Sequence, residues 1–243
     1  MDAVYRADLA HIHDAGFTAF ARNAGSGLLQ LFAHHQITEG RIVDLGCGSG
    51  VWARMLVDAG YEVHGIDISK DMIDLCRARV PEATFVVDSF LKAQLPACKV
   101  VTSIGECLNY LFDTSNNLTS LEELFERVYQ ALEDGGLFVF DIIEPGYAAA
   151  TGPPKRHVLT DTWAVLVEIE EDAANNTLKR SITSFKETGG AYRREEEVHH
   201  VQLYRGEDLK RVLENVGFSV TLNDGYPDFS LTATHAVLIA QKT

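Results

Sequence analysis

The segment that most restricts the fold of this chain is an apolar run that ends in a glycine-rich turn, between residues 41 and 50. The run leads into Gly46, Gly48 and Gly50, and a helical pattern follows from Trp52. Consecutive apolar residues before such a turn are typical of a strand buried on both faces of a parallel sheet. Glycine is needed there where the backbone adopts a positive φ or where a ligand approaches the main chain closely. The segment therefore predicts an α/β fold that binds a nucleotide-like ligand at this turn.

A second strand, over residues 61–66, ends at Asp67, which lies 17 residues beyond Gly50. A carboxylate at the tip of the second strand can accept two hydrogen bonds from a ribose diol. The glycine turn, however, lacks the further glycine that a pyrophosphate site requires for close approach of the helix, because Val51 stands at that position. The spacing predicts a ribose-containing ligand and disfavours NAD and FAD.

Composition restricts the class of partner. The chain has 243 residues, enough for one α/β domain with an insertion, and its formal net charge is -14. Such a charge, with no basic stripe to offset it, opposes approach to a phosphate backbone, so nucleic acid is not expected as a partner. The four cysteines are widely spaced and form no Cys-x-x-Cys pair. We expect buried free thiols and no metal site.

No segment of the sequence suggests a membrane. The N-terminus has no apolar signal region, and no apolar run reaches the roughly 18 residues that a spanning helix needs. A soluble cytoplasmic protein is expected.

The two motifs together resemble a known family. Val-Asp-Leu-Gly-Cys-Gly-Ser-Gly (residues 43–50), followed by Gly-Ile-Asp-Ile-Ser (65–69), is similar to the class I S-adenosylmethionine-dependent methyltransferases. The resemblance covers nearly all of residues 38–145 and 206–243. It implies a Rossmann-like seven-stranded methyltransferase sheet, with S-adenosyl-L-methionine as the cofactor.

The resemblance also implies which residues bind the cofactor. In the family, an acidic residue at the tip of the third strand, here Asp88, bonds the adenine amino group, and the next residues flank the ring. From the residues alone, Asp88 would cap a turn. The expected cofactor-binding residues are Asp44, Gly46, Cys47, Gly48, Asp67, Ile68, Asp88, Ser89, Phe90, Ile104 and Gly105.

The loop after the fourth predicted strand, at residues 105–111, is expected to border the reacting methyl group, because ligands of open α/β sheets bind at the carboxyl ends of the strands. Its sequence resembles small-molecule methyltransferases and lacks the Asn/Asp-Pro-Pro-Tyr/Phe motif of enzymes that methylate adenine, cytosine or glutamine. Glu106, Asn109 and Tyr110 are candidates to face the pocket. The alternative is a solvated carboxylate with two structural turn residues.

Residues 1–37 place apolar side chains at helical spacing and predict two or three helices. The resemblance implies that they form a helical lid over the cofactor, which would bring Tyr5 and His13 into the site. Solvated surface positions are the alternative for both.

Residues 146–205 are predicted to form an inserted antiparallel β-sheet, because apolar and polar residues alternate in three runs. Asn175-Asn176 and Gly189-Gly190 would form the hairpin turns. This arrangement resembles the insertion of bacterial aminosugar N-methyltransferases. Trp163 lies on the apolar face, which would cover the acceptor or, alternatively, form a homodimer interface.

Other elements complete the fold. An amphipathic helix from Leu121 is expected to end at Gly135-Gly136, before a very apolar strand over 137–143. The chain should finish with a helix ended by Gly217 and two strands, as the resembled fold does.

Methyl transfer from a sulfonium needs alignment more than a particular catalytic residue, although an amine acceptor must lose its proton. Glu106, His199 and His200 are candidates for that proton transfer, and only one of the two adjacent histidines on a strand can face the pocket. The leading hypothesis is transfer of a methyl group to N or O of a small-molecule acceptor. A non-catalytic module that binds S-adenosylmethionine or S-adenosylhomocysteine, or an aminopropyl transferase, stays open as an alternative.

Overall fold

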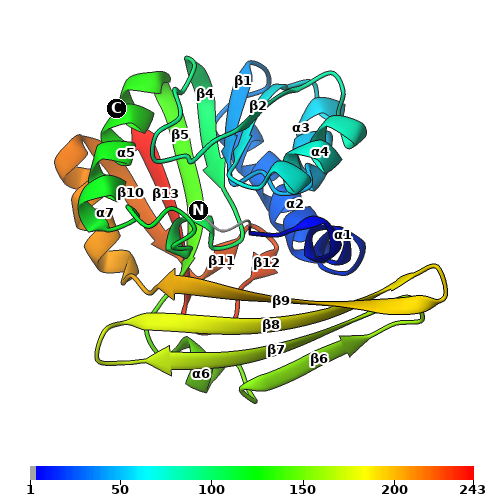
Figure 1. Cartoon of the computed structure of the whole chain (residues 1–243). Coiled ribbons are helices and arrows are strands. Elements are labelled where there is room, and N and C mark those ends of the chain that lie inside the picture. Colours follow the sequence, from blue (N-terminus) through cyan, green and yellow to red (C-terminus); the bar gives the residue numbers. More distant parts are fainter. Residues whose placement is uncertain (1–3) are drawn as a thin grey trace.

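The centre of the molecule is a seven-stranded sheet with the strand order β10-β13-β5-β4-β1-β2-β3, in a computed structural model that describes residues 4–243 (Figure 1). Strand β13 runs antiparallel to β5 and β10, and the other pairs are parallel. The strands are β1 (Arg41–Leu45), β2 (Glu62–Asp67), β3 (Thr84–Val87), β4 (Cys98–Ser103), β5 (Leu132–Ile143), β10 (Phe218–Asn223) and β13 (His235–Lys242). This confirms the predicted Rossmann-like sheet, including its antiparallel strand near the C-terminus.

Helices cover both faces of this sheet because alternate strand residues point to opposite sides. Ile42 of β1 packs in the apolar cluster under α2, α3 and α4, and Val43 packs in the cluster under α5 and α7. The five helices are α2 (Ala19–His34), α3 (Val51–Asp58), α4 (Lys70–Arg79), α5 (Leu118–Ala131) and α7 (Gly206–Val216). As predicted, α7 ends at Gly217, whose φ is +119°.

One helix end differs from the expectation. Helix α5 stops at Ala131, and Leu132 is already extended, so Gly135-Gly136 lies inside β5 and does not terminate the helix. The pairing of β4 with β5 shifts between Cys98 and Val100 at this point, and Gly135 has a φ of +77°. The two glycines therefore accommodate a bulge at the start of the strand.

The insertion forms a separate four-stranded antiparallel sheet with the order β6-β7-β8-β9. Its strands are β6 (Lys155–Leu159), β7 (Trp163–Asp172), β8 (Thr177–Thr188) and β9 (Ala191–Gln202). The hairpin turn at Gly189-Gly190 has φ values of +61° and +84°, as predicted, and Asn175-Asn176 lies in the other turn. Strand β6, the short helix α6 (Tyr147–Ala150) and the small hairpin of β11 (Gly225–Tyr226) and β12 (Phe229–Ser230) were not expected from the sequence.

The N-terminal segment forms two helices, α1 (Ala7–Gly16) and α2, and α1 contacts both the core and the insertion (Figure 1). Asp14 accepts a hydrogen bond from Arg79 of α4 at 3.0 Å. Asp8 accepts hydrogen bonds from Arg193 of β9, with both distances 2.5 Å. Helix α1 is thus held by charged contacts from two sides.

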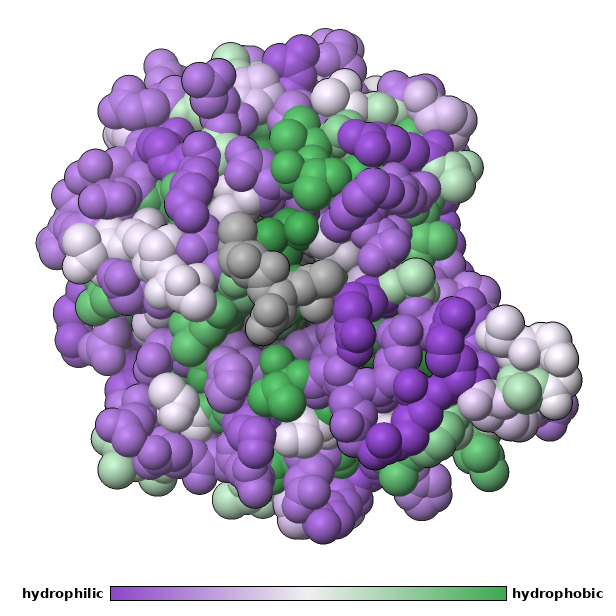
Figure 2. All heavy atoms as spheres, viewed as in Figure 1, coloured by the Kyte–Doolittle hydropathy of each residue, from purple (hydrophilic) through white to green (hydrophobic). Residues whose placement is uncertain are grey.

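Hydrophilic side chains cover most of the face shown in Figure 2, and apolar side chains form small separate patches on it. Over residues 4–243, no helix is long and apolar enough to cross a membrane.

Candidate active site

A cavity of about 560 Å³ lies where the core, the N-terminal segment and the insertion meet. The core contributes the glycine turn and the ends of β2 and β4, while the insertion contributes the inward face of β7, β8 and β9. Its volume is that of ordinary small-molecule sites. A single cavity therefore reaches from the glycine turn to the inserted sheet.

The glycine turn has the backbone conformation that its residues predict, since Gly46, Gly48 and Gly50 all have positive φ values, of +73°, +54° and +79°. The amides of Gly46 and Cys47 donate to the carbonyl of Ile66 at 2.8 and 3.1 Å, which fixes the turn against the end of β2. A Cβ on Gly48 would meet no atom of the described chain within 4 Å. The backbone of Gly48 is thus open to the cavity.

Asp67 joins the turn to the start of α4. Its carboxylate accepts hydrogen bonds from the amides of Gly48 at 2.9 Å and Ser69 at 2.8 Å. Ser69 caps the helix, because its hydroxyl accepts a hydrogen bond from the amide of Met72. Burial raises the pKa of Asp67. A carboxylate has about four acceptor sites, so lone pairs remain for a ligand in the cavity.

Asp44, at the base of the cavity, belongs to a buried polar chain. The indole of Trp52 donates to the hydroxyl of Thr102 at 3.1 Å, and that hydroxyl donates to Asp44 at 2.8 Å. Burial raises the pKa of Asp44 to about 7, since little besides this hydroxyl offsets the loss of water. Asp44 can therefore exchange a proton near neutral pH.

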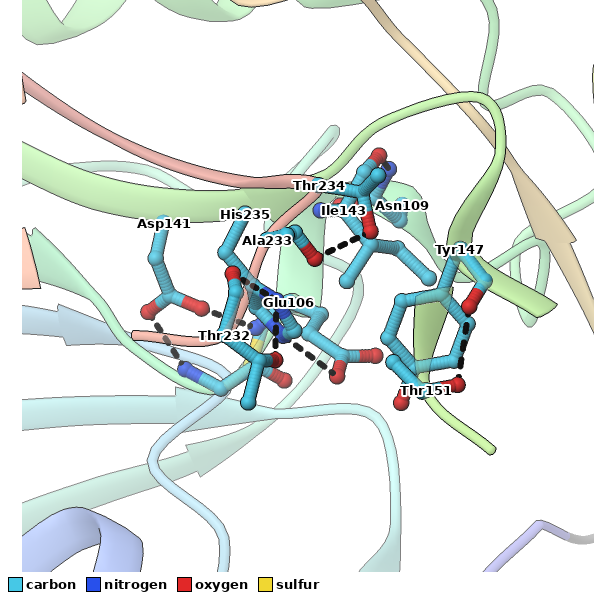
Figure 3. Close-up of polar contacts among 12 residues, drawn as sticks. Glu106, Asn109, Asp141, Ile143, Tyr147, Thr151, Thr232, Ala233, Thr234 and His235 are labelled. Atoms are coloured by element: carbon cyan, nitrogen blue, oxygen red, sulfur yellow. Dashed lines mark hydrogen bonds and ion pairs between the residues drawn. The ribbon is translucent and has the colours of Figure 1, made fainter. Parts of the chain in front are cut away.

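The loop after β4 brings Glu106 against the insertion. Glu106 accepts a hydrogen bond from Arg180 of β8 at 2.7 Å, and Arg180 also donates to the hydroxyl of Tyr110 at 2.6 Å. Burial would raise the pKa of Glu106, but Arg180 and His235, whose Nε2 lies 3.8 Å from the carboxylate, lower it below its usual value. Figure 3 shows Glu106 beside His235. A carboxylate anion is thus held at the cavity wall.

Asp141 of β5 fixes the conformation of this loop. Its carboxylate accepts from the amides of Gly105 at 2.7 Å and Glu106 at 2.9 Å, and from the hydroxyl of Tyr226 at 2.6 Å. Figure 3 shows Asp141 near Glu106. Glu106 has a φ of +63°, which non-glycine residues rarely adopt. The buried carboxylate of Asp141 stabilises that conformation.

Rings from the N-terminal segment, from the loop after β4 and from β9 meet in the wall of the cavity. The ring of Tyr5 lies 5.3 Å from that of His13 and 4.9 Å from that of His199, and Phe112 lies 4.9 Å from His199. Burial lowers the pKa of His13 to about 4, so His13 is neutral at pH 7. This part of the cavity wall is therefore aromatic and carries an uncharged imidazole at His13.

Most of the residues that the sequence singled out line this one cavity, although they come from distant parts of the chain. They are Tyr5, His13, Asp44, Gly46, Cys47, Gly48, Asp67, Ile68, Ser89, Phe90, Ile104, Gly105, Glu106, Tyr110 and His199.

Four candidates are absent from the cavity lining. His200 is exposed on the outer face of β9, because its neighbour His199 points inward. Trp163 packs under α1 with Leu9 and Ile12, since the start of β7 lies beneath that helix. Neither His200 nor Trp163 therefore reaches the cavity in this structure.

Asn109 and Asp88 hydrogen-bond to the backbone of the protein and do not line the cavity. The Asn109 amide donates to the carbonyls of Ile143 and Gln202 at 3.0 and 2.7 Å and accepts from the Ile143 amide, so it joins the core to β9 as a buried turn residue. Asp88 accepts from the amide of Ser89 at 2.8 Å, the turn-capping alternative. Neither side chain lines the cavity, in contrast to the expectation.

Sequence reasoning missed several residues of the lining, above all Arg180, Phe112 and Tyr147. Arg180 shares the inward face of β8 with Leu178 and Ile182, whose side chains are buried. A charged residue at an apolar position of an alternating strand is the feature that could have indicated it.

Within residues 4–243, no three His, Cys, Asp or Glu side chains form a group that could hold a metal ion. The four cysteines are free, with Cys47 Sγ 3.7 Å from Cys76 Sγ.

Known proteins share this fold and sequence pattern. A methyltransferase-named protein of Geobacillus sp. strain WCH70 is 26% identical over 197 residues, 74% of each chain. The dTDP-3-amino-3,6-dideoxy-alpha-D-glucopyranose N,N-dimethyltransferase of Streptomyces fradiae is 25% identical and is matched over 93% of this chain and 89% of its own. An S-adenosylmethionine-dependent methyltransferase structure from Clostridium acetobutylicum has a TM-score of 0.81 at 18% identity, over 96% of this chain and 97% of its own, and so shares the fold. Residues 17–223 match the methyltransferase domain family. The chain belongs to that family.

Proposed function

We propose that this methyltransferase transfers the methyl group of S-adenosylmethionine to a nitrogen or oxygen of a small molecule that binds between the core and the inserted sheet. The observation that carries the proposal is the single cavity, which has the glycine turn and Asp67 at one end and Tyr110, Arg180 and His199 at the other. A donor and an acceptor in one cavity can be held in line for direct transfer.

The residues at the turn fit the donor. Gly48 leaves its backbone open to the cavity, where a Cβ would fill the space. Asp67 lines the same end with acceptor sites for a ribose diol. Ser89 and Phe90 lie in the lining at the end of β3, where we propose that they flank the adenine. When bound, S-adenosylmethionine supplies a methyl group on a positively charged sulfur that leaves as a neutral sulfide.

The remaining wall suits an acceptor with an apolar part and a polar reacting group. Val165, Val167, Ile169 and Ile182 present aliphatic side chains from the insertion to the cavity. Glu106 supplies a carboxylate anion beside them, and His199 supplies a buried imidazole. We propose that Glu106 orients a cationic or hydrogen-bond-donating acceptor and that His199 accepts its proton.

An amino sugar attached to a nucleotide is the first acceptor to test, since the Streptomyces fradiae relative is named for N,N-dimethylation of such a compound. The experiment incubates the protein with methyl-labelled S-adenosylmethionine and a panel of amino sugars, nucleotide-linked amino sugars and phenols. We expect label in one class of acceptor.

Two other functions are separated by the same experiment. A non-catalytic binding module would bind S-adenosylhomocysteine and label no acceptor. An aminopropyl transferase would use decarboxylated S-adenosylmethionine and label acceptors only from a propyl-labelled donor. The apolar far end of the cavity, which a binding module does not need, favours the methyl transfer.

Three further properties belong to this proposal. The net charge of -14 supports a small molecule over a nucleic acid as acceptor. We propose a cytoplasmic location from the free cysteines. We also propose a homodimer through the outer face of the insertion, where Leu159, Leu166 and Val198 are exposed at 76%, 46% and 49%. Light scattering of the protein and of Leu159→Lys tests the dimer.

A further inference from the structure

Glu197 and His199 occupy alternate positions of β9 and therefore lie on the same face of the strand. Both side chains are buried, with exposures of 6% and 1%. The Nε2 atom of His199 lies 2.9 Å from the carboxylate of Glu197. Because an ionised carboxylate only accepts hydrogen bonds, Nε2 carries the hydrogen in this contact.

The other nitrogen of His199 is then an unprotonated acceptor in the neutral ring. Nδ1 is buried and has no hydrogen-bond partner among residues 4–243, whereas nearly all buried polar atoms in proteins are paired. The ring lines the cavity. An unpaired acceptor in a cavity wall indicates that a bound molecule supplies the donor.

The same carboxylate holds the N-terminal segment. Glu197 accepts hydrogen bonds from the backbone amides of Tyr5 at 2.8 Å and Arg6 at 2.9 Å. On its other side, the carbonyl of Tyr5 accepts from the hydroxyl of Ser69 at 3.0 Å, two residues after Asp67. Tyr5 has a φ of 45°, so these contacts fix a backbone conformation that a non-glycine residue rarely adopts. Tyr5 is thus held between the core and the insertion.

We infer that Glu197 is a positioning residue that couples docking of the N-terminal segment to the presentation of His199 Nδ1 as the proton acceptor of the reaction. The inference rests on the proposed function only in assigning the proton to a methyl acceptor. That proton moves to Nδ1, and the electron pair it leaves on nitrogen or oxygen forms the bond to the methyl carbon. The electron pair of the broken carbon–sulfur bond stays on sulfur, and the imidazolium is paired with Glu197.

Several elements bring other groups close to His199. Arg180 is its direct neighbour in the pairing of β8 with β9. Tyr5 and His13 approach from the N-terminal segment, and Tyr110 approaches from the loop after β4, where Glu106 neutralises Arg180.

The experiment measures the imidazole ¹⁵N shifts of His199 and the hydrogen exchange of the Tyr5 and Arg6 amides at pH 8, in the 243-residue chain without an acceptor. The wild-type protein should show hydrogen on Nε2 of His199 and slow exchange of both amides. In Glu197→Gln, an amide nitrogen at the position of Oε2 can donate to Nε2, so the imidazole hydrogen should move to Nδ1. The Tyr5 amide then loses its acceptor and should exchange at least about tenfold faster, whereas the Arg6 amide keeps the remaining oxygen. Glu196→Gln, on the outer face, should change neither quantity.

His199→Ala separates the two roles of Glu197, since it should leave the Tyr5 and Arg6 amides protected within about threefold. Wild-type His199 with its hydrogen on Nδ1 would overturn the inference, and this spectrum decides even if Glu197→Gln does not fold. Unchanged exchange of the Tyr5 amide in a folded Glu197→Gln variant would also overturn it. Both measurements need no methyl acceptor. If no acceptor in the panel is methylated but the shifts and exchange rates are as expected, the proposed function is wrong. The coupling of the N-terminal segment to His199 through Glu197 is then still supported.

Discussion

The guanidinium of Arg180 lies 2.7 Å from the carboxylate of Glu106, although 74 residues separate them in the chain. Arg180 belongs to the inserted sheet and Glu106 to the loop after β4, so a buried ion pair joins the two parts at the cavity wall. Their side chains are only 12% and 15% exposed. The contact fixes the insertion over the ends of the core strands, where the cavity lies.

Removing one member of this pair should destabilise the protein strongly. Glu106→Gln leaves the Arg180 guanidinium without its carboxylate, and Arg180→Met leaves the Glu106 carboxylate without its guanidinium. Each change should lower the free energy of unfolding by about 3–5 kcal/mol. The double variant should cost less than the sum of the two. Urea denaturation measures all three. As a control, Glu168→Gln breaks the exposed ion pair with Lys155 in the same sheet and should cost under about 1 kcal/mol. Equal losses of stability in Glu168→Gln and Glu106→Gln would show that the pair at the cavity wall is no stronger than an exposed one.

Asp67 should be needed for cofactor binding more than for folding. Asp67→Ala removes the acceptor for the amides of Gly48 and Ser69 together with the proposed ribose contact, each charge-assisted bond being worth about 1.5–3 kcal/mol. Calorimetry with S-adenosylhomocysteine should show at least about a hundredfold loss of affinity. Asp71→Ala, in the first turn of α4 and outside the cavity lining, should bind normally. Normal binding by Asp67→Ala would place the ribose elsewhere.

Gly48→Val should block the cofactor by occupying the space that the turn leaves open. Gly60 provides a matched control, because its φ of +95° is also positive and a Cβ there likewise meets no described atom within 4 Å, but it lies outside the cavity lining. Both substitutions carry backbone strain of about 1–2 kcal/mol. Only Gly48→Val should abolish binding of S-adenosylhomocysteine in calorimetry. Equal affinities in the two variants would show that the ligand stays away from the turn.

The local features of the core could be predicted from the sequence. The glycine turn and Asp67 follow two adjacent parallel strands of one βαβ unit, so both lie at the same edge of the sheet. The bulge at Gly135 could not be predicted, because a Gly-Gly pair ends a helix or kinks a strand equally well. Strand β6 was missed for a related reason, since Lys155 and Arg156 interrupt the alternation at an exposed sheet edge.

The far wall of the cavity depends on contacts between distant segments. Glu197 bonds the backbone of Tyr5, which lies 192 residues earlier, and no local pattern reveals such a pairing. The alternation on β9 did predict that only one of His199 and His200 faces inward. Which of them does so depends on the register of the strand over the core, and that register follows from the tertiary packing.

The stability of the ligand-free protein should fall between mildly acidic and neutral pH because of Asp44. Its folded pKa of about 7 lies above its ordinary value of 3.8, so the folded protein binds a proton that the unfolded chain releases in this window. The stabilisation is therefore present below pH 3.8 and is lost as the pH rises toward 7. Asp44→Asn keeps an acceptor for Thr102 without a charge. Urea denaturation should show that the wild type loses stability relative to this variant between pH 5 and pH 8. A difference in unfolding free energy that stays constant with pH would show that Asp44 does not titrate in this range.

The inserted sheet should determine the acceptor while the core binds the cofactor independently. The glycine turn, Asp67 and Phe90 all precede the insertion in the chain, whereas the aliphatic far wall comes from it. Replacing residues 155–203 with a Gly/Ser linker should keep affinity for S-adenosylhomocysteine within about tenfold, or 1.4 kcal/mol, and abolish methyl transfer.

The same replacement also tests the proposed dimer. It removes Leu159, Leu166 and Val198 from the surface, so the variant should be a monomer in light scattering if the insertion forms the interface. Tyr5 and Arg6 lose Glu197 as their acceptor, and hydrogen exchange of the N-terminal segment should therefore rise. A variant that stays folded by circular dichroism but no longer binds S-adenosylhomocysteine would show that the cofactor site depends on the insertion, through the N-terminal segment that it holds in place.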